Sequence, residues 1–304
     1  MNQPKKSILL DNGESIAYLE MGNKGSLLSS LIGKGHRTLI MLHGILASSV
    51  QFHHFYPALS SQFMIMAPDI RGFGHSSYQT PIKSVDDLVE DLKNFIDKFK
   101  LEKVSLLGYS LGGGAALTFA AKYPNYVEKL ILLNSVGSQG LPTYRDLEPR
   151  DVTGRVSTFD ELLKVNEVQR IDTIIKEQNK KEMKQIIESG LMAVEDSLIS
   201  EGLTEEALLC KNYIDITWAS NIFNISTDYN GVSFGNGLIH DIKCPTLIIH
   251  GALDHISPVK EALEYKEVIG ENAKLKIFPH SGHSFKLSDV EDITNLITEF
   301  CTKD

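Results

Sequence analysis

The sequence predicts an α/β protein with a doubly wound, mostly parallel sheet and an inserted helical cap. Short apolar runs alternate with amphipathic helical segments through the first 135 residues, and such runs are typical of strands buried on both faces. The pattern then becomes helical and charged, and strand-like runs resume near residue 246. This order indicates one sheet domain made of residues 1–135 and 238–304, interrupted by a cap of residues 136–237.

Composition limits the possible functions. The 304 residues are 42% hydrophobic and 23% charged, which is enough apolar material for a buried sheet. The net charge of −9 and the absence of a clustered basic surface argue against a nucleic-acid partner. No apolar run reaches the roughly 20 residues of a membrane helix, and no signal-peptide core follows the N-terminus. Three scattered cysteines favour a reducing compartment, so we expect a cytoplasmic protein without membrane insertion.

The N-terminal part is predicted to begin with two short strands. Residues 7–20 alternate around a turn at Asp11-Asn12-Gly13, and residues 21–37 form a longer connection of undefined shape. A continuous apolar run over residues 38–42 ends at His43-Gly44, and a second covers residues 63–67. Both apolar runs are expected to be buried parallel strands.

An amphipathic helix is predicted after Ser84. Ser84 has Asp87 three residues later, the pattern of a capping box, and apolar side chains follow at helical spacing up to Phe99. The neighbouring acidic residues Glu90 and Asp91 are expected on its solvated face.

The next strand–helix–strand unit contains the main motif. Residues 103–107 form an apolar strand, residues 113–122 a helix of small residues, and residues 127–133 another strand. In the cap, Thr158 with Glu161 predicts a helix start, and Thr204 predicts another. Strands are then expected at residues 246–250 and 274–278, and a final helix at residues 290–300.

The segment Gly108-x-Ser110-x-Gly112 lies between a predicted strand and a predicted helix. A nucleophile can project its hydroxyl from such a turn only if the flanking residues lack Cβ atoms where strand and helix nearly touch. The start of a helix also favours developing negative charge. Ser110 is therefore the candidate nucleophile.

A serine nucleophile needs a base and an acid that orients the base. Active groups in doubly wound sheets lie at the carboxyl ends of strands. Asp254 follows the predicted strand at residues 246–250, and His283 follows the strand at residues 274–278. The resulting order of serine, aspartate and histidine is that of the nucleophile-elbow template.

These segments resemble the α/β-hydrolase superfamily over nearly the whole chain. The matching stretches are His43-Gly44-Ile45, Asp69 to Ser76, Gly108 to Gly114, and Gly282-His283. The resemblance implies a triad of Ser110, Asp254 and His283, and an oxyanion hole made by the backbone N–H groups of Ile45 and Leu111. It implies supporting roles for His43, Gly44, Gly108 and Gly112, and it implies no metal or organic cofactor.

Other residues compete for some of these roles. His280 is the rival base, but His283 follows the glycine of the family's Gly-His pattern. Asp241 and Asp289 are weaker rivals for the acid. Some relatives carry the acid after the strand at residues 127–133, where this chain has the uncharged Asn134 and Ser135.

The substrate pocket is the least defined part of the prediction. Tyr109 and two cap residues, Tyr144 and Trp218, are candidates for lining it, although aromatic residues at helical spacing more often form packing contacts. His53, His54 and His255 do not have the spacing of a metal site.

The motifs narrow the reaction class. Serine at position 110 disfavours the alkyl-enzyme chemistry of epoxide hydrolases and haloalkane dehalogenases. Carbon–carbon bond hydrolases of the meta-cleavage type tend to have Asn before the serine and Trp after the histidine, where this chain has Tyr109 and Ser284. The expected function is hydrolysis of a small, partly apolar ester or lactone. Carbon–carbon hydrolysis, thioester hydrolysis, acyl transfer and a ligand receptor on a hydrolase fold stay open, as does the oligomeric state.

Overall fold

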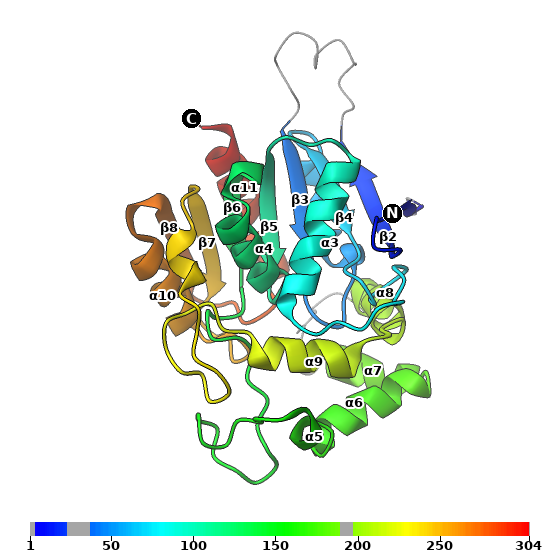
Figure 1. The fold of residues 1–304 in the computed structure, drawn as a ribbon. Coiled ribbons are helices and arrows are strands. Elements are labelled where there is room, and N and C mark those ends of the chain that lie inside the picture. Colours follow the sequence, from blue (N-terminus) through cyan, green and yellow to red (C-terminus); the bar gives the residue numbers. More distant parts are fainter. Residues whose placement is uncertain (1–3, 23–36, 189–196, 304) are drawn as a thin grey trace.

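A computed structural model describes residues 4–22, 37–188 and 197–303 of the chain. They form one eight-stranded sheet in the order β1-β2-β4-β3-β5-β6-β7-β8 (Figure 1). The first two strands pair antiparallel, β2 is antiparallel to β4, and the other neighbours are parallel. The strands are β1 (Lys6–Leu9), β2 (Ser15–Met21), β3 (Thr38–Leu42), β4 (Met64–Pro68), β5 (Val104–Tyr109), β6 (Val127–Leu133), β7 (Thr246–Gly251) and β8 (Ala273–Phe278).

Helices cover both faces of the sheet, as a doubly wound fold requires. Side chains alternate along the strands, so that Leu106 joins one apolar cluster with α3, α4 and α10, while Leu107 joins another with α2 and α11. The helices are α2 (Tyr56–Leu59), α3 (Val85–Lys98), α4 (Leu111–Lys122), α10 (Val259–Ile269) and α11 (Val290–Thr302). Short 3-10 turns are η1 (Ser49–Phe52), η2 (Pro124–Tyr126), η4 (Leu238–Asp241), η5 (Gly270–Asn272) and η6 (Leu287–Asp289). The predicted α/β fold class with a doubly wound, mostly parallel sheet is therefore confirmed.

Helix α3 begins with the predicted capping box of Ser84 and Asp87. The expectation that Asp91 is solvated was wrong. Asp91 is buried because its carboxylate receives two hydrogen bonds from the Arg71 guanidinium, of 2.6 and 2.5 Å. A buried charge of this kind needs a hydrogen-bonded partner, and the loop after β4 supplies it.

Further helices lie beyond the carboxyl ends of the parallel strands (Figure 1). They are α5 (Phe159–Leu162), α6 (Asn166–Lys176), α7 (Lys180–Ile186), α8 (Ser197–Leu208) and α9 (Tyr213–Ile222). The Thr158 side chain caps α5 as expected. The predicted helix start at Thr204 was wrong, because Thr204 is fully buried inside α8, which begins at Ser197. We keep the name cap for residues 136–237.

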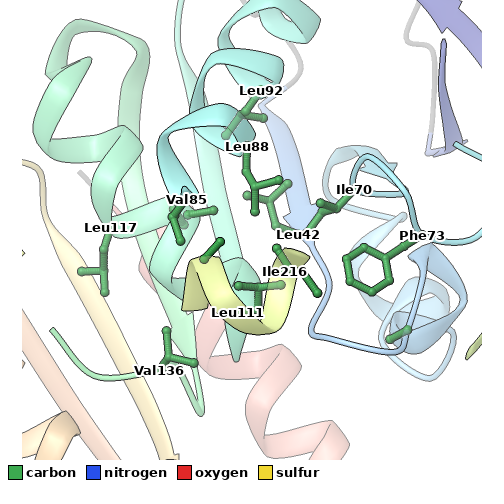
Figure 2. Close-up of a cluster of buried hydrophobic side chains, with 14 of the residues drawn as sticks. Leu42, Ile70, Phe73, Val85, Leu88, Leu92, Leu111, Leu117, Val136 and Ile216 are labelled. Carbon is green, nitrogen blue, oxygen red and sulfur yellow. The ribbon is translucent and has the colours of Figure 1, made fainter. Parts of the chain in front are cut away.

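The cap and the sheet share apolar packing. Ile216 of α9 lies beside Leu111 at the start of α4, and both belong to one buried cluster (Figure 2). The connection expected at residues 21–37 lies almost wholly outside the described residues. Within the described ranges, no helix has the length and apolar character needed to cross a membrane.

Candidate active site

Ser110 occupies the turn between β5 and α4. Strand β5 runs to Tyr109 and α4 begins at Leu111, so the turn is tighter than the sequence predicted. The Ser110 backbone has φ 53° and ψ −118°, a strained conformation for a residue with a side chain. A Cβ on Gly108 would lie 2.3 Å from the carbonyl oxygen of Gly112, which explains why glycine is needed there.

A chain of hydrogen bonds joins the three candidate catalytic side chains. The His283 Nε2 lies 3.0 Å from Ser110 Oγ, and His283 Nδ1 lies 2.8 Å from Asp254 Oδ2. All three residues are buried. The other Asp254 oxygen, Oδ1, accepts the N–H groups of Ile256 and Ser257 at 2.9 and 2.8 Å. The structure thus brings together the residues that the sequence placed on three separate strand ends.

Two residues that the sequence analysis did not assign support this arrangement. Asn134, at the end of β6, accepts the Gly251 N–H and donates to the carbonyl oxygens of Gly282 and His283. His250, on β7, contacts the Ser257 carbonyl oxygen at 2.7 Å, and its Nε2 lies 3.5 Å from Asp254 Oδ2. The sequence signal for Asn134 is a polar residue directly after a buried strand.

Burial determines the charge of His250 and His43, the two other histidines that contact residues of the candidate active site. It lowers the pKa of His250 from its ordinary value, and it lowers the pKa of His43 to about 4. Both rings are therefore neutral at pH 7. For His43, Nδ1 donates to the Gly44 carbonyl oxygen at 2.7 Å and Nε2 accepts the Ile70 N–H at 2.8 Å. These contacts fit a supporting role.

The predicted oxyanion donors come from two segments that meet at Ser110. Leu111 is the first residue of α4, and Ile45 follows Gly44, whose position would put a Cβ 3.2 Å from the Ser110 Cβ. Within the described part of the chain, no acceptor receives the backbone N–H of Ile45 or Leu111. Two donors of this kind beside a nucleophile can stabilise a developing oxyanion.

The rival residues lie apart from this chain of contacts. His280 and Asp241 are exposed, and Asp289 accepts a hydrogen bond from the Ser281 hydroxyl. In the ranges that the structure describes, no group of three or more His, Cys, Asp or Glu side chains is placed to hold a metal ion.

The candidate pocket residues occupy different positions. The Tyr109 hydroxyl donates to the His283 carbonyl oxygen, and burial raises the pKa of this phenol. Trp218 is half-buried and packs edge-on against Phe159, with ring centroids 5.9 Å apart. Tyr144 is half-buried and forms an isolated β-bridge with Arg155. Their role in binding substrate stays a prediction.

Comparison with known proteins identifies a family for this fold. A family model described as the alpha/beta hydrolase fold matches residues 37–290. The AB hydrolase superfamily protein YisY of Bacillus subtilis is 26% identical over 293 residues, covering 93% of this chain and 98% of that protein. The 2-hydroxy-6-oxo-2,4-heptadienoate hydrolase of Pseudomonas putida is 24% identical, covering 88% and 90%.

Solved structures show the same fold. An enol-lactonase from Burkholderia xenovorans has a TM-score of 0.74 at 14% identity, covering 98% of this chain and all of its own. An esterase from Exiguobacterium antarcticum has a TM-score of 0.73 at 23% identity, covering 98% and 99%.

Proposed function

The chain belongs to the alpha/beta hydrolase fold family, and from that premise we propose that it is a serine hydrolase with Ser110 as nucleophile. Its proposed substrate is a carboxylic ester or lactone of a small, partly apolar molecule. The observation that carries the proposal is the hydrogen-bond chain from Ser110 through His283 to Asp254. The proposal also includes a role as a cap over the active site for residues 136–237, and a cytoplasmic location for the protein.

The proposed reaction has two halves, and His283 acts in each of them first as a base and then as an acid. Ser110 Oγ attacks the carbonyl carbon while His283 Nε2 takes its proton, and Asp254 stabilises the resulting imidazolium. The N–H groups of Ile45 and Leu111 would bind the oxyanion. His283 then protonates the departing alkoxide, which leaves an acyl group on Ser110. Water then attacks the acyl carbonyl carbon while His283 takes its proton, and His283 returns that proton to Ser110 Oγ as the bond to the acyl group breaks and the acid leaves.

One specific observation favours a second candidate. The heptadienoate hydrolase aligns with 88% of this chain, so cleavage of a 2-hydroxy-6-oxo-dienoate by the same side chains is the alternative. Turnover of that dienoate and of short p-nitrophenyl esters and lactones should be compared as kcat/KM. A preference for the dienoate would replace the ester proposal but keep the nucleophile.

Covalent labelling tests the nucleophile itself. A fluorophosphonate probe should label the wild-type protein and fail to label Ser110→Ala, while peptide mapping should place the adduct on Ser110. Ser135→Ala is the matched control, because Ser135 is also buried near α4 but donates to the Val136 carbonyl oxygen. Labelling that survives in Ser110→Ala, or a wild-type protein that never reacts, would contradict the proposal.

A further inference from the structure

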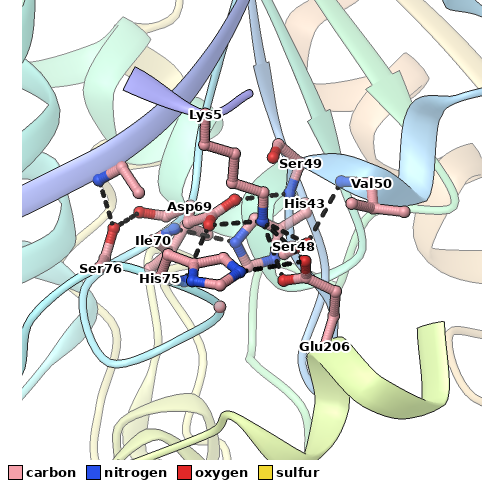
Figure 3. Close-up of polar contacts among 12 residues, drawn as sticks. Lys5, His43, Ser48, Ser49, Val50, Asp69, Ile70, His75, Ser76 and Glu206 are labelled. Carbon is pink, nitrogen blue, oxygen red and sulfur yellow. Dashed lines mark hydrogen bonds and ion pairs between the residues drawn. The ribbon is translucent and has the colours of Figure 1, made fainter. Parts of the chain in front are cut away.

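A cluster of charged side chains joins the N-terminal segment, the end of β4 and cap helix α8 (Figure 3). Lys5 directly precedes β1, and its Nζ lies 2.8 Å from Asp69 Oδ2. The same Nζ lies 3.0 and 2.9 Å from the two oxygens of Glu206 and 3.3 Å from Ser48 Oγ. One ammonium group therefore binds a carboxylate of the sheet domain and a carboxylate of the cap.

These charges are largely removed from water. The side chain of Asp69 is fully buried, and those of Lys5 and Glu206 are only 13% and 12% exposed. Burial alone would raise the pKa of Asp69. The Lys5 charge and the hydrogen bonds to Asp69 have the larger effect, so the pKa of Asp69 lies below its ordinary value. Asp69 is thus ionised. Without Lys5, the Asp69 and Glu206 carboxylates would lose the ammonium group that is hydrogen-bonded to both, which is costly in a buried site.

Asp69 also holds the far end of the loop that follows β3. Its Oδ1 accepts the backbone N–H of Ser49 at 2.9 Å, while Ser48 Oγ accepts the N–H of Val50 and caps η1. The Lys5 ammonium contacts both Asp69 and Ser48. Removing it would therefore free two groups that order this part of the backbone.

The next residue, Ile70, holds the near end of the same loop. Its N–H donates to His43 Nε2, and His43 Nδ1 donates to the carbonyl oxygen of Gly44. Ile45 lies between these two anchored ends, so the position of its N–H depends on residues 69 and 70.

The segment that directly follows α8 docks on the same region. The Lys211 backbone N–H donates to the Gly72 carbonyl oxygen at 2.7 Å, and Lys211 Nζ binds the carbonyl oxygens of Gly74 and Ser76. These contacts keep Glu206, five residues earlier in the chain, within reach of Lys5. Movement of α8 would withdraw the Glu206 carboxylate from the cluster.

We propose that Lys5, Asp69 and Glu206 form a latch that couples docking of cap helix α8 to the position of the Ile45 N–H. Lys5 and Glu206 are then positioning residues, and their catalytic consequence rests on the serine-hydrolase function proposed above. The latch makes the oxyanion donor fully ordered only when the cap is docked.

Hydrogen exchange tests the coupling without relying on activity. In Lys5→Met, backbone exchange over residues 43–52 should be faster than in wild type, because the Ser49 amide loses a fixed acceptor. Glu206→Gln should produce a smaller increase, since the pair between Lys5 and Asp69 remains. Lys6→Met is the matched control: its ammonium pairs with Glu20 at 2.8 Å, and its side chain is 48% exposed. It should leave exchange over residues 43–52 unchanged.

Kinetics on a p-nitrophenyl ester test the consequence. Complete loss of one oxyanion donor costs about 10²–10³-fold in rate, so a misplaced donor in Lys5→Met should lower kcat by about 10-fold. KM should change much less, and Lys5→Arg should recover most of kcat. Glu206→Gln should lower kcat by about 3-fold.

The outcomes separate the latch from the proposed function. Unchanged exchange over residues 43–52 in both Lys5→Met and Glu206→Gln would overturn the latch, whatever the activity. If Lys5→Met does not fold, Glu206→Gln and Lys5→Arg decide on their own. A changed exchange pattern with an unaltered kcat would refute the positioning role. A wild-type protein that neither reacts with fluorophosphonate nor hydrolyses esters refutes the hydrolase function, and exchange still tests the coupling.

Discussion

The candidate active site and the cap bury charged groups in different ways. In the active site, the His283 ring lies between Asp254 and Ser110, so its charged form would have an anionic neighbour 2.8 Å away. In the cap, the Arg155 guanidinium is buried and binds neutral oxygens from Gln139, Asn221 and Asn230. Burial accordingly lowers the pKa of Arg155 to about 10.

This difference indicates a separate role for each region. His283 becomes charged during the proposed reaction, and Asp254 is placed to stabilise that charge. The Arg155 guanidinium binds carbonyl and amide oxygens from three separate segments, which orders a part of the chain whose described residues contribute no strand to the sheet. A substitution in the first region should therefore alter rate, and one in the second should alter stability.

The largest expected effect is on the active-site pair. Asp254→Asn should lower kcat by about 10³–10⁴-fold, because the imidazole loses the charge that orients it and stabilises its protonated form. The thermal midpoint should change little. The measurement is ester turnover beside a melting curve, with Asp289→Asn as control, since Asp289 contacts Ser281 rather than His283. Near-normal turnover in Asp254→Asn would place the acid elsewhere.

Arg155→Met tests the other half of the comparison. Loss of the guanidinium leaves buried carbonyl oxygens without donors, so the free energy of unfolding should fall by about 3 kcal/mol. Urea denaturation measures this, and fluorophosphonate labelling of the folded variant should persist. Arg170→Met is the control: its side chain is 48% exposed and pairs with Glu167, so the change should stay below about 0.5 kcal/mol. A stable Arg155→Met variant that no longer reacts with the probe would reverse the proposed division of roles.

The sequence was most informative where function depends on local backbone geometry. Ser110 could be identified because the turn demands glycine at positions 108 and 112, and strand order places Asp254 and His283 at the same edge of the sheet. Those constraints act over a few residues or follow from parallel pairing.

Contacts between distant segments could not be predicted in this way. The bond between Arg71 and Asp91 spans 20 residues, and the contact between Lys5 and Glu206 spans 201. Asp91 has the helical spacing of a solvated acid, but Arg71 of the β4 loop and Asn12 of the turn between β1 and β2 both donate hydrogen bonds to its buried carboxylate. Thr204 shows the same limit, because a pattern typical of a helix start also occurs inside α8, where Thr204 is packed against other residues.

The smallest effect is expected at Glu261, where the sheet domain meets the cap. This α10 residue packs against Gly137, just after the chain leaves β6, and within the described residues its Oε2 has no hydrogen-bond partner. Burial raises its pKa from 4.5 to about 8. Between these two values the folded protein binds more protons at this site than the unfolded chain, so the Glu261 contribution to stability falls as pH rises.

Glu261→Gln should therefore unfold at a higher urea concentration than wild type at pH 8, and the difference should shrink towards pH 4. His43 and His250 act in the opposite direction, because their lowered pKa values remove stability as pH falls below about 6.5. Both histidines are present in wild type and variant, so the difference between the two urea curves isolates Glu261. Glu267→Gln, on the exposed face of the same helix, is the matched control for replacing a carboxyl group by an amide on α10. A Glu261→Gln curve parallel to wild type from pH 4 to pH 8 would mean that this carboxyl is ionised in the folded protein, and that the junction tolerates a charge as the Arg155 site does.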